Sequence, residues 1–102
     1  MGNMHIDIPQ KQVVDLCRRH HVRRLSLFGS VMRDDFGPQS DVDVLVEFEE
    51  GNGPSLAGLI RLQDELSGIF GQRPVDVATP SILQNPYRRK SILKDLTPIY
   101  GA

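Results

Sequence analysis

The chain has 102 residues, of which 39% are hydrophobic and 25% charged, values that fit one globular domain spanning residues 1–102 and exclude a disordered chain. The formal net charge is −1, so no overall positive field attracts nucleic acid. Cys17 is the only cysteine, which excludes an intramolecular disulfide and a cysteine-based zinc site and leads us to expect a reducing, cytoplasmic setting. No apolar run reaches the ~20 residues that a membrane-spanning helix requires.

The first half of the chain alternates helical and extended patterns. Apolar residues recur at helical spacing from Pro9 to about His20, which predicts an amphipathic helix. Arg24–Phe28 is a short strand pattern, residues 30–33 resemble a short helix, and a Gly-Pro pair predicts a loop over residues 34–40. Asp41–Phe48 gives the strongest strand signal, because valines alternate there with acidic residues.

The second half begins with a predicted helix over Leu56–Phe70, and Gly71 follows it as a C-terminal cap. Its expected apolar stripe consists of Leu56, Leu59, Ile60, Leu66, Ile69 and Phe70. Residues 74–78 predict a short strand and Thr79-Pro80 a capped helical turn. Asn85-Pro86 begins a last helix that extends to about Leu96, and residues 97–102 form a tail that adds a brief edge strand. The order predicts an α/β fold: a small mixed sheet with helices packed on one face and the other face open for chemistry.

The pair Asp41 and Asp43 is the first candidate site. Residues two apart on a strand point to the same face, so the two carboxylates lie side by side, roughly 6–7 Å apart at Cα. Apolar packing does not explain two adjacent like charges, whereas a divalent cation removes their repulsion. Ligands that offer only oxygen atoms suit Mg²⁺ or Mn²⁺ rather than Zn²⁺.

Gly29-Ser30 and Asp76 extend this candidate site. A glycine between a strand and a short helix lets a ligand approach the backbone, and the following helix start offers N–H groups to a phosphate. Asp76 lies between two valines of a strand, so its side chain points away from the core, toward Asp41 and Asp43. A third carboxylate there would complete a metal site and could act as a general base.

Two stretches carry a family resemblance, Leu27–Arg33 (LFGSVMR) and Ser40–Val46 (SDVDVLV). They resemble the signature of the polymerase-β-like nucleotidyltransferases. The ten residues between Ser30 and Asp41 and the ending Pro98–Gly101 are similar to the minimal subgroup that includes the MntA antitoxins of HepT/MntA toxin–antitoxin modules. The resemblance spans roughly residues 25–76 and, more loosely, the whole chain.

The resemblance implies transfer of AMP from ATP, with Mg²⁺, to a tyrosine hydroxyl of a small helical HEPN-type toxin. By the same resemblance, the metal-binding and catalytic residues would be Asp41, Asp43 and Asp76, and the nucleotide-binding residues Gly29, Ser30, Arg33 and Ser40. Larger relatives carry an extra helical domain for the acceptor, and we expect a partner protein to supply it here.

Other interpretations remain open. The carboxylates could be solvated strand-end residues, Arg33 an exposed surface charge, and the pair His20-His21 a polar helix end. The basic run Arg88–Lys90 is a solvated face, or it contacts an acidic partner surface or RNA, although Tyr87 alone supplies little aromatic stacking. Alternative functions are a non-catalytic toxin-neutralising module, or nucleotidyl transfer to a small molecule or RNA.

Overall fold

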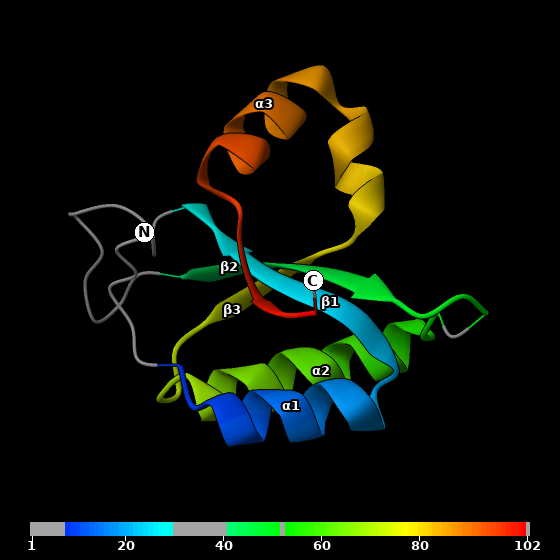
Figure 1. The fold of residues 1–102 in the computed structure, drawn as a ribbon, viewed down its shortest axis with the longest axis vertical. Helices are drawn as coiled ribbons and strands as arrows, with labels where there is room; N and C mark the ends of the chain where they lie inside the picture. The colour runs from blue at the N-terminus through cyan, green and yellow to red at the C-terminus, as the bar shows by residue number, and fades with distance from the viewer. Residues whose placement is uncertain (1–7, 30–40, 52, 102) are drawn as a thin grey trace.

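A four-stranded mixed sheet forms the centre of the molecule in a computed structural model that describes residues 8–29, 41–51 and 53–101 (Figure 1). The strand order is β3-β2-β1-β4. β1 (Val22–Phe28) pairs antiparallel with both β2 (Val42–Phe48) and β4 (Thr97–Tyr100), whereas β2 pairs in parallel with β3 (Val75–Ala78). The expected edge strand at the chain end is therefore confirmed as β4, and each of the other predicted strands is found within two residues of its expected bounds.

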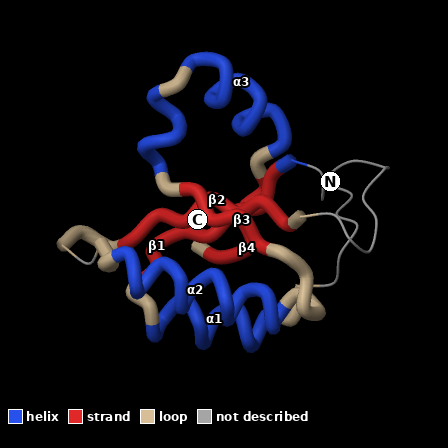
Figure 2. The backbone as a smooth tube through the Cα atoms, turned by 180° about the vertical axis from the view of Figure 1, so that it is seen from behind, coloured by secondary structure: helices blue, strands red, loops and turns tan. Residues whose placement is uncertain are grey.

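Two helices, α1 (Gln10–Arg19) and α2 (Leu56–Ile69), cover one face of the sheet (Figures 1 and 2). The alternation along β2 decides which side chains meet them, because every second residue points to the same face. The main core on this side consists of buried side chains from both helices and the first three strands: Val13, Leu16, Cys17, Val22, Leu25, Leu27, Val42, Val44, Val46, Leu62, Leu66, Phe70 and Val75.

The 3₁₀ helix η2 (Pro80–Gln84) and the helix α3 (Pro86–Asp95) lie on the opposite face (Figures 1 and 2). Their core is much smaller, with Phe28, Leu45 and Ile92 as its buried members. The predicted α/β class and small mixed sheet are confirmed. The second face is not left bare, however, because η2 and α3 cover part of it.

The buried stripe of α2 differs from the predicted one. Leu62 and Leu66 are fully buried, whereas Leu56 and Ile60 are 75% and 53% exposed. At 100° per residue, Leu56 and Ile60 lie more than a quarter-turn from the direction of Leu62, so they cannot face the sheet together with it. The position of the sheet selects one of two apolar stripes that this helix offers.

The helix ends follow the predicted capping signals in most cases. Asn85 caps α3, and its Oδ1 accepts hydrogen bonds from the backbone N–H groups of Tyr87 and Arg88. Gly71 follows α2 with a φ of +78°, as expected for a glycine that terminates a helix. The Thr79 hydroxyl contacts the Ser81 hydroxyl and does not cap the backbone of η2. Across the described residues, no helix has the length and apolar character to cross a bilayer.

Candidate active site

Asp43 and Asp76 lie side by side on neighbouring strands. β2 and β3 pair in parallel with Asp43 opposite Asp76, so the two Cα atoms are separated by about one interstrand spacing, ~4.8 Å. Their neighbours Val42 and Val75 are buried against α1 and α2, and both carboxylates therefore point to the face that bears η2 and α3. Asp43 is half-buried and Asp76 exposed, so the pair is accessible to a ligand from solvent.

Asp41 directly precedes β2 and is exposed. The backbone N–H of Val42 donates to the carbonyl of Pro74 over 2.8 Å, so the pairing with the β3 segment already holds at the residue after Asp41. Strand alternation places Asp41 on the same side as Asp43. Asp41 and Asp43 thus both lie at the start of β2, and Asp43 is the one that lies opposite Asp76.

Gly29 contributes the third part of the site, from the end of β1. Phe28 pairs with Asp43 across the antiparallel ladder, which brings the next residue, Gly29, over the Asp43 carboxylate. A Cβ atom at Gly29 would overlap Oδ2 of Asp43 and lie 3.2 Å from its Cγ. The φ of Gly29 is +77°, which side-chain-bearing residues rarely adopt. The backbone conformation therefore favours glycine, and a side chain at this position would also displace the Asp43 carboxylate.

The donor set of this site fits a hard divalent cation. Asp41, Asp43 and Asp76 offer only carboxylate oxygens, the ligands that Mg²⁺ prefers. Within residues 8–29, 41–51 and 53–101, no three or more His, Cys, Asp or Glu side chains converge closely enough to form a complete metal cage. Mg²⁺ is commonly held by one or two carboxylates together with water and substrate phosphates, so the adjacent pair Asp43 and Asp76 suits a metal that arrives with a nucleotide.

The remaining predicted nucleotide-binding residues, Ser30, Arg33 and Ser40, lie outside the described residues, as do the predicted short helix and loop around them. Their roles therefore stay predictions.

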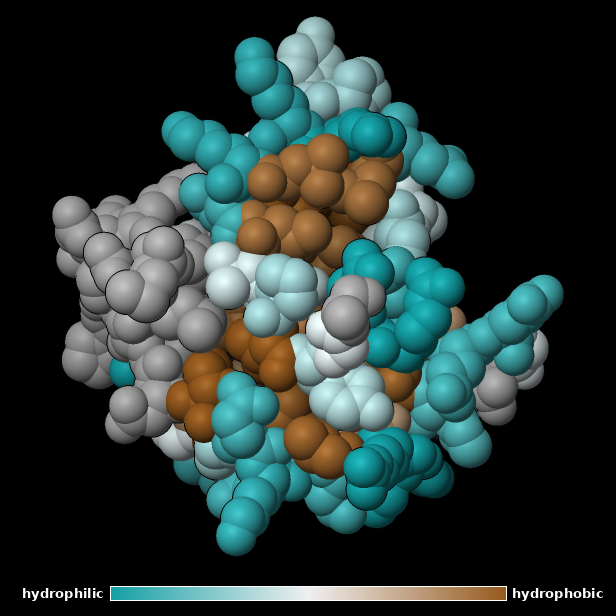
Figure 3. Space-filling view, in the orientation of Figure 1, coloured by the Kyte–Doolittle hydropathy of each residue, from teal (hydrophilic) through white to brown (hydrophobic). Residues whose placement is uncertain are grey.

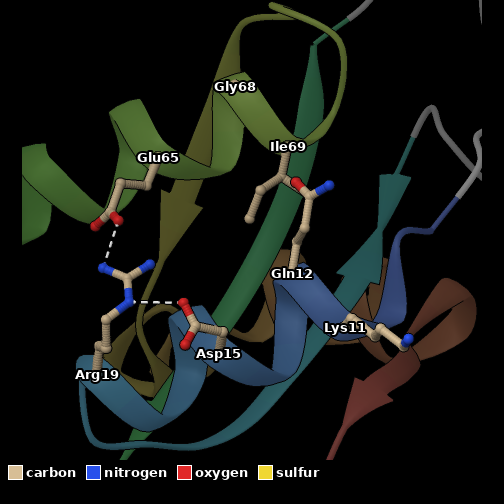
Figure 4. A pocket seen from close by; sticks show the side chains of 7 residues that line it. All are labelled: Lys11, Gln12, Asp15, Arg19, Glu65, Gly68 and Ile69. Carbon is tan, nitrogen blue, oxygen red and sulfur yellow. Dashed lines mark hydrogen bonds and ion pairs between the residues drawn. The ribbon is translucent and has the colours of Figure 1, made fainter.

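A groove of about 550 Å³ lies between α1 and α2, the two helices that cover the face of the sheet opposite η2 and α3 (Figure 4). In this groove Arg19 donates to Asp15 over 2.9 Å and to Glu65 over 2.7 Å, joining the two helices. The second carboxylate oxygen of Glu65 contacts His20 Nε2. Arg19, Asp15 and Glu65 are thus matched with one another and tie α1 to α2, and we assign the groove a structural role.

No pattern in the sequence predicts the contacts of Glu65. The sequence pattern predicts only a polar helix end at His20, and the 45 positions that separate His20 from Glu65 carry no local signal of their contact. Burial acts to raise the pKa of Glu65, but hydrogen bonds from His20 and Arg19 outweigh it and hold that pKa below its ordinary value.

Cys17 is buried in the main core, and burial raises the pKa of its thiol to about 12. A thiol with this pKa carries almost no thiolate at neutral pH and is a poor nucleophile. Cys17 therefore fills the core.

Comparisons with known proteins agree with this geometry. A family model described as "Nucleotidyltransferase domain" matches residues 10–99. A Thermococcus cleftensis protein named protein adenylyltransferase MntA is 38% identical over 80% of this chain and 79% of its own length. A Methanocaldococcus jannaschii protein, provisionally named a protein adenylyltransferase, is 38% identical over 88% of this chain and 89% of its own length.

Solved structures share the fold. One, provisionally described as a minimal nucleotidyltransferase, is 34% identical, with a TM-score of 0.69, and the match covers 94% of this chain and 99% of the other. The crystal structure of a toxin–antitoxin with AMP-PNP matches at a TM-score of 0.68 and 16% identity, over 92% of this chain and 74% of the other. The family match spans most of the chain, and the chain therefore belongs to the nucleotidyltransferase domain family and is a nucleotidyltransferase.

Proposed function

We propose that this protein transfers AMP from ATP to a hydroxyl of a partner protein, a tyrosine of a small helical HEPN-type toxin, and so acts as an antitoxin. The main support for the transfer reaction is the register of β2 and β3, which places Asp43 beside Asp76. Gly29, which has no side chain, lies over the Asp43 carboxylate. The names of the relatives support protein adenylylation, and the fold shared with a toxin–antitoxin structure supports the choice of partner.

Each residue of the site has a distinct role in this proposal. Asp43 and Asp76 would hold Mg²⁺ together with the nucleotide phosphates, and Asp41 is the third candidate ligand, at the start of β2. The bound Mg²⁺ would neutralise the triphosphate charge and favour attack at the α-phosphorus. Gly29 leaves room for the triphosphate to approach the backbone, and the N–H groups that follow it would bind phosphate oxygens. Ser30, Arg33 and Ser40 would add donors to the same phosphates.

The covalent step balances with these groups alone. The acceptor hydroxyl oxygen forms a bond to the α-phosphorus of ATP, and the bond from that phosphorus to the bridging oxygen breaks, releasing pyrophosphate. Asp76 is the more exposed carboxylate of the adjacent pair, so an acceptor arriving from solvent reaches it first. We assign it the general base that takes the hydroxyl proton.

The test is AMP incorporation into a candidate small helical HEPN-type toxin, measured by mass spectrometry with ATP and MgCl₂. Asp43→Asn and Asp76→Asn should each reduce incorporation by at least ~100-fold, the loss typical when a catalytic carboxylate is removed. Asp64→Asn is the matched control, because Asp64 is an exposed carboxylate on α2, against the other face of the sheet. Full activity of the Asp43 and Asp76 variants would refute the proposed site.

Two alternative functions give different results in the same experiment. A non-catalytic neutralising module would suppress the toxin equally well as wild type and as Asp43→Asn, with no mass increase on the toxin. Transfer to a small molecule or RNA would consume ATP and release pyrophosphate without labelling the toxin, and labelled ATP, GTP, CTP and UTP would identify the nucleotide.

A further inference from the structure

The exposed side of α3 carries a concentrated positive charge. The helix contains four basic residues and one acidic residue in ten positions. We define the basic α3 surface by its exposed residues Tyr87, Arg88, Arg89, Lys90, Leu93 and Lys94. Tyr87 is 87% exposed and Leu93 45%, so apolar groups lie among the charges.

The charges of α3 differ from those of α1 in their pairing. In α1, Arg19 forms ion pairs with Asp15 and Glu65. Among the residues that the structure describes, by contrast, none of the four basic side chains of α3 forms an ion pair. A run of like charges without local partners repels itself, and an external anionic surface would relieve that repulsion.

The basic α3 surface belongs to the same face of the sheet as the carboxylates. α3 and η2 cover the side on which Asp43 and Asp76 point, whereas α1 and α2 occupy the other. Figure 3 shows apolar surface at the α3 and η2 end of the molecule, rimmed by hydrophilic side chains. Partly exposed Ile82, Leu83 and Leu96 pack around the small core there. An apolar centre with a charged rim is the usual anatomy of a protein interface.

We propose that the basic α3 surface docks an acidic, partly apolar surface of the acceptor protein and so presents the acceptor hydroxyl to Asp76. This inference rests on the proposed function, since it names the recognition chemistry of the same acceptor. The apolar residues among the charges favour a protein over RNA, because RNA binding to exposed bases calls for several stacking aromatic groups and α3 has only Tyr87. The overall charge of −1 also provides no long-range attraction for nucleic acid, so binding would depend on the local charge of α3.

The test measures binding of the full chain to fluorescein-labelled poly-L-glutamate by anisotropy, with oligouridine RNA as a second probe. Arg88→Glu with Lys90→Glu should weaken poly-L-glutamate binding roughly tenfold and flatten its salt dependence. Arg88 lies in the first turn of α3 and Lys90 close behind it, where glutamate suits the helix dipole, so this variant should fold. Circular dichroism and thermal melting verify its folding.

The matched control is Lys11→Glu with Arg18→Glu, the same charge change on exposed residues of α1. Equal losses in both double variants would overturn the proposal, because net charge and not α3 would then control binding. Tighter binding of oligouridine than of poly-L-glutamate through α3 would also overturn it, in favour of an RNA site. A weakened Kd for ATP in the α3 variant would overturn it as well, by assigning the charges to the nucleotide.

Failure of the docking proposal is distinguishable from failure of the proposed function. Poly-L-glutamate binding requires neither ATP nor Asp43, so α3-dependent binding without AMP transfer would leave the docking surface standing and refute only the enzymatic role. AMP transfer that is indifferent to Arg88→Glu with Lys90→Glu would refute the docking surface alone.

Discussion

Replacing Gly29 with alanine tests whether the glycine positions the Asp43 carboxylate. The φ of +77° at Gly29 costs a side-chain-bearing residue about 1–2 kcal/mol. The new methyl group would also overlap Oδ2 of Asp43, and ordinary van der Waals contact begins at 3.4 Å, so the carboxylate must move by about 1 Å. A misplacement of this size at a reacting centre costs about 100-fold in rate, equivalent to about 2.7 kcal/mol.

Gly71→Ala separates the two effects. Gly71 has nearly the same φ, +78°, but a Cβ there meets nothing within 4 Å. In urea denaturation both variants should lose stability because of the positive φ, and Gly29→Ala should lose more because its methyl group also meets Asp43. Only Gly29→Ala should lose kcat/KM for AMP transfer. If Gly29→Ala stays as active as Gly71→Ala, the contact with Asp43 does not position the carboxylate and this part of the site is wrong.

Three further predictions concern stability and reactivity. Because the pKa of Glu65 is lowered in the folded state, its contribution to stability is present above about pH 4.5 and disappears as the pH falls through the lowered value. Glu65→Gln should thus lower the free energy of unfolding by about 1 kcal/mol at pH 7, and in urea titrations the difference from wild type should shrink as the pH falls below 4.5 and through the lowered pKa. Cys17, whose thiol pKa is about 12, should resist Ellman's reagent at pH 8 in the native protein and react completely once unfolded; rapid native labelling would contradict its burial. Leu66→Ala should cost about 2–5 kcal/mol because Leu66 is fully buried, whereas Ile60→Ala, at a 53% exposed position, should change stability by less than about 1 kcal/mol; similar losses would place Ile60 in the core after all.

Local sequence patterns predict neither the contacts of Glu65 nor the side of α2 that is buried against the sheet. Periodicity predicts that residues 56–70 are helical, but it does not say which of two apolar stripes meets the sheet. Only docking against the strands selects Leu62 over Leu56 and Ile60. Contacts such as that of His20 with Glu65 depend on where two helices cross, which no short stretch of sequence encodes.

The sequence by itself determined the elements and the chemistry of this protein. Strand alternation is a local property, so the residues of one strand are enough to assign Val42 and Val44 to the core and Asp41 and Asp43 to the opposite side. The tertiary structure alone decided which strands become neighbours. The parallel register of β2 with β3 brought Asp76 to Asp43, and the antiparallel register of β1 with β2 brought Gly29 over the same carboxylate. Register joins residues more than ten positions apart, and the packing of the whole sheet, rather than any single segment, determines it.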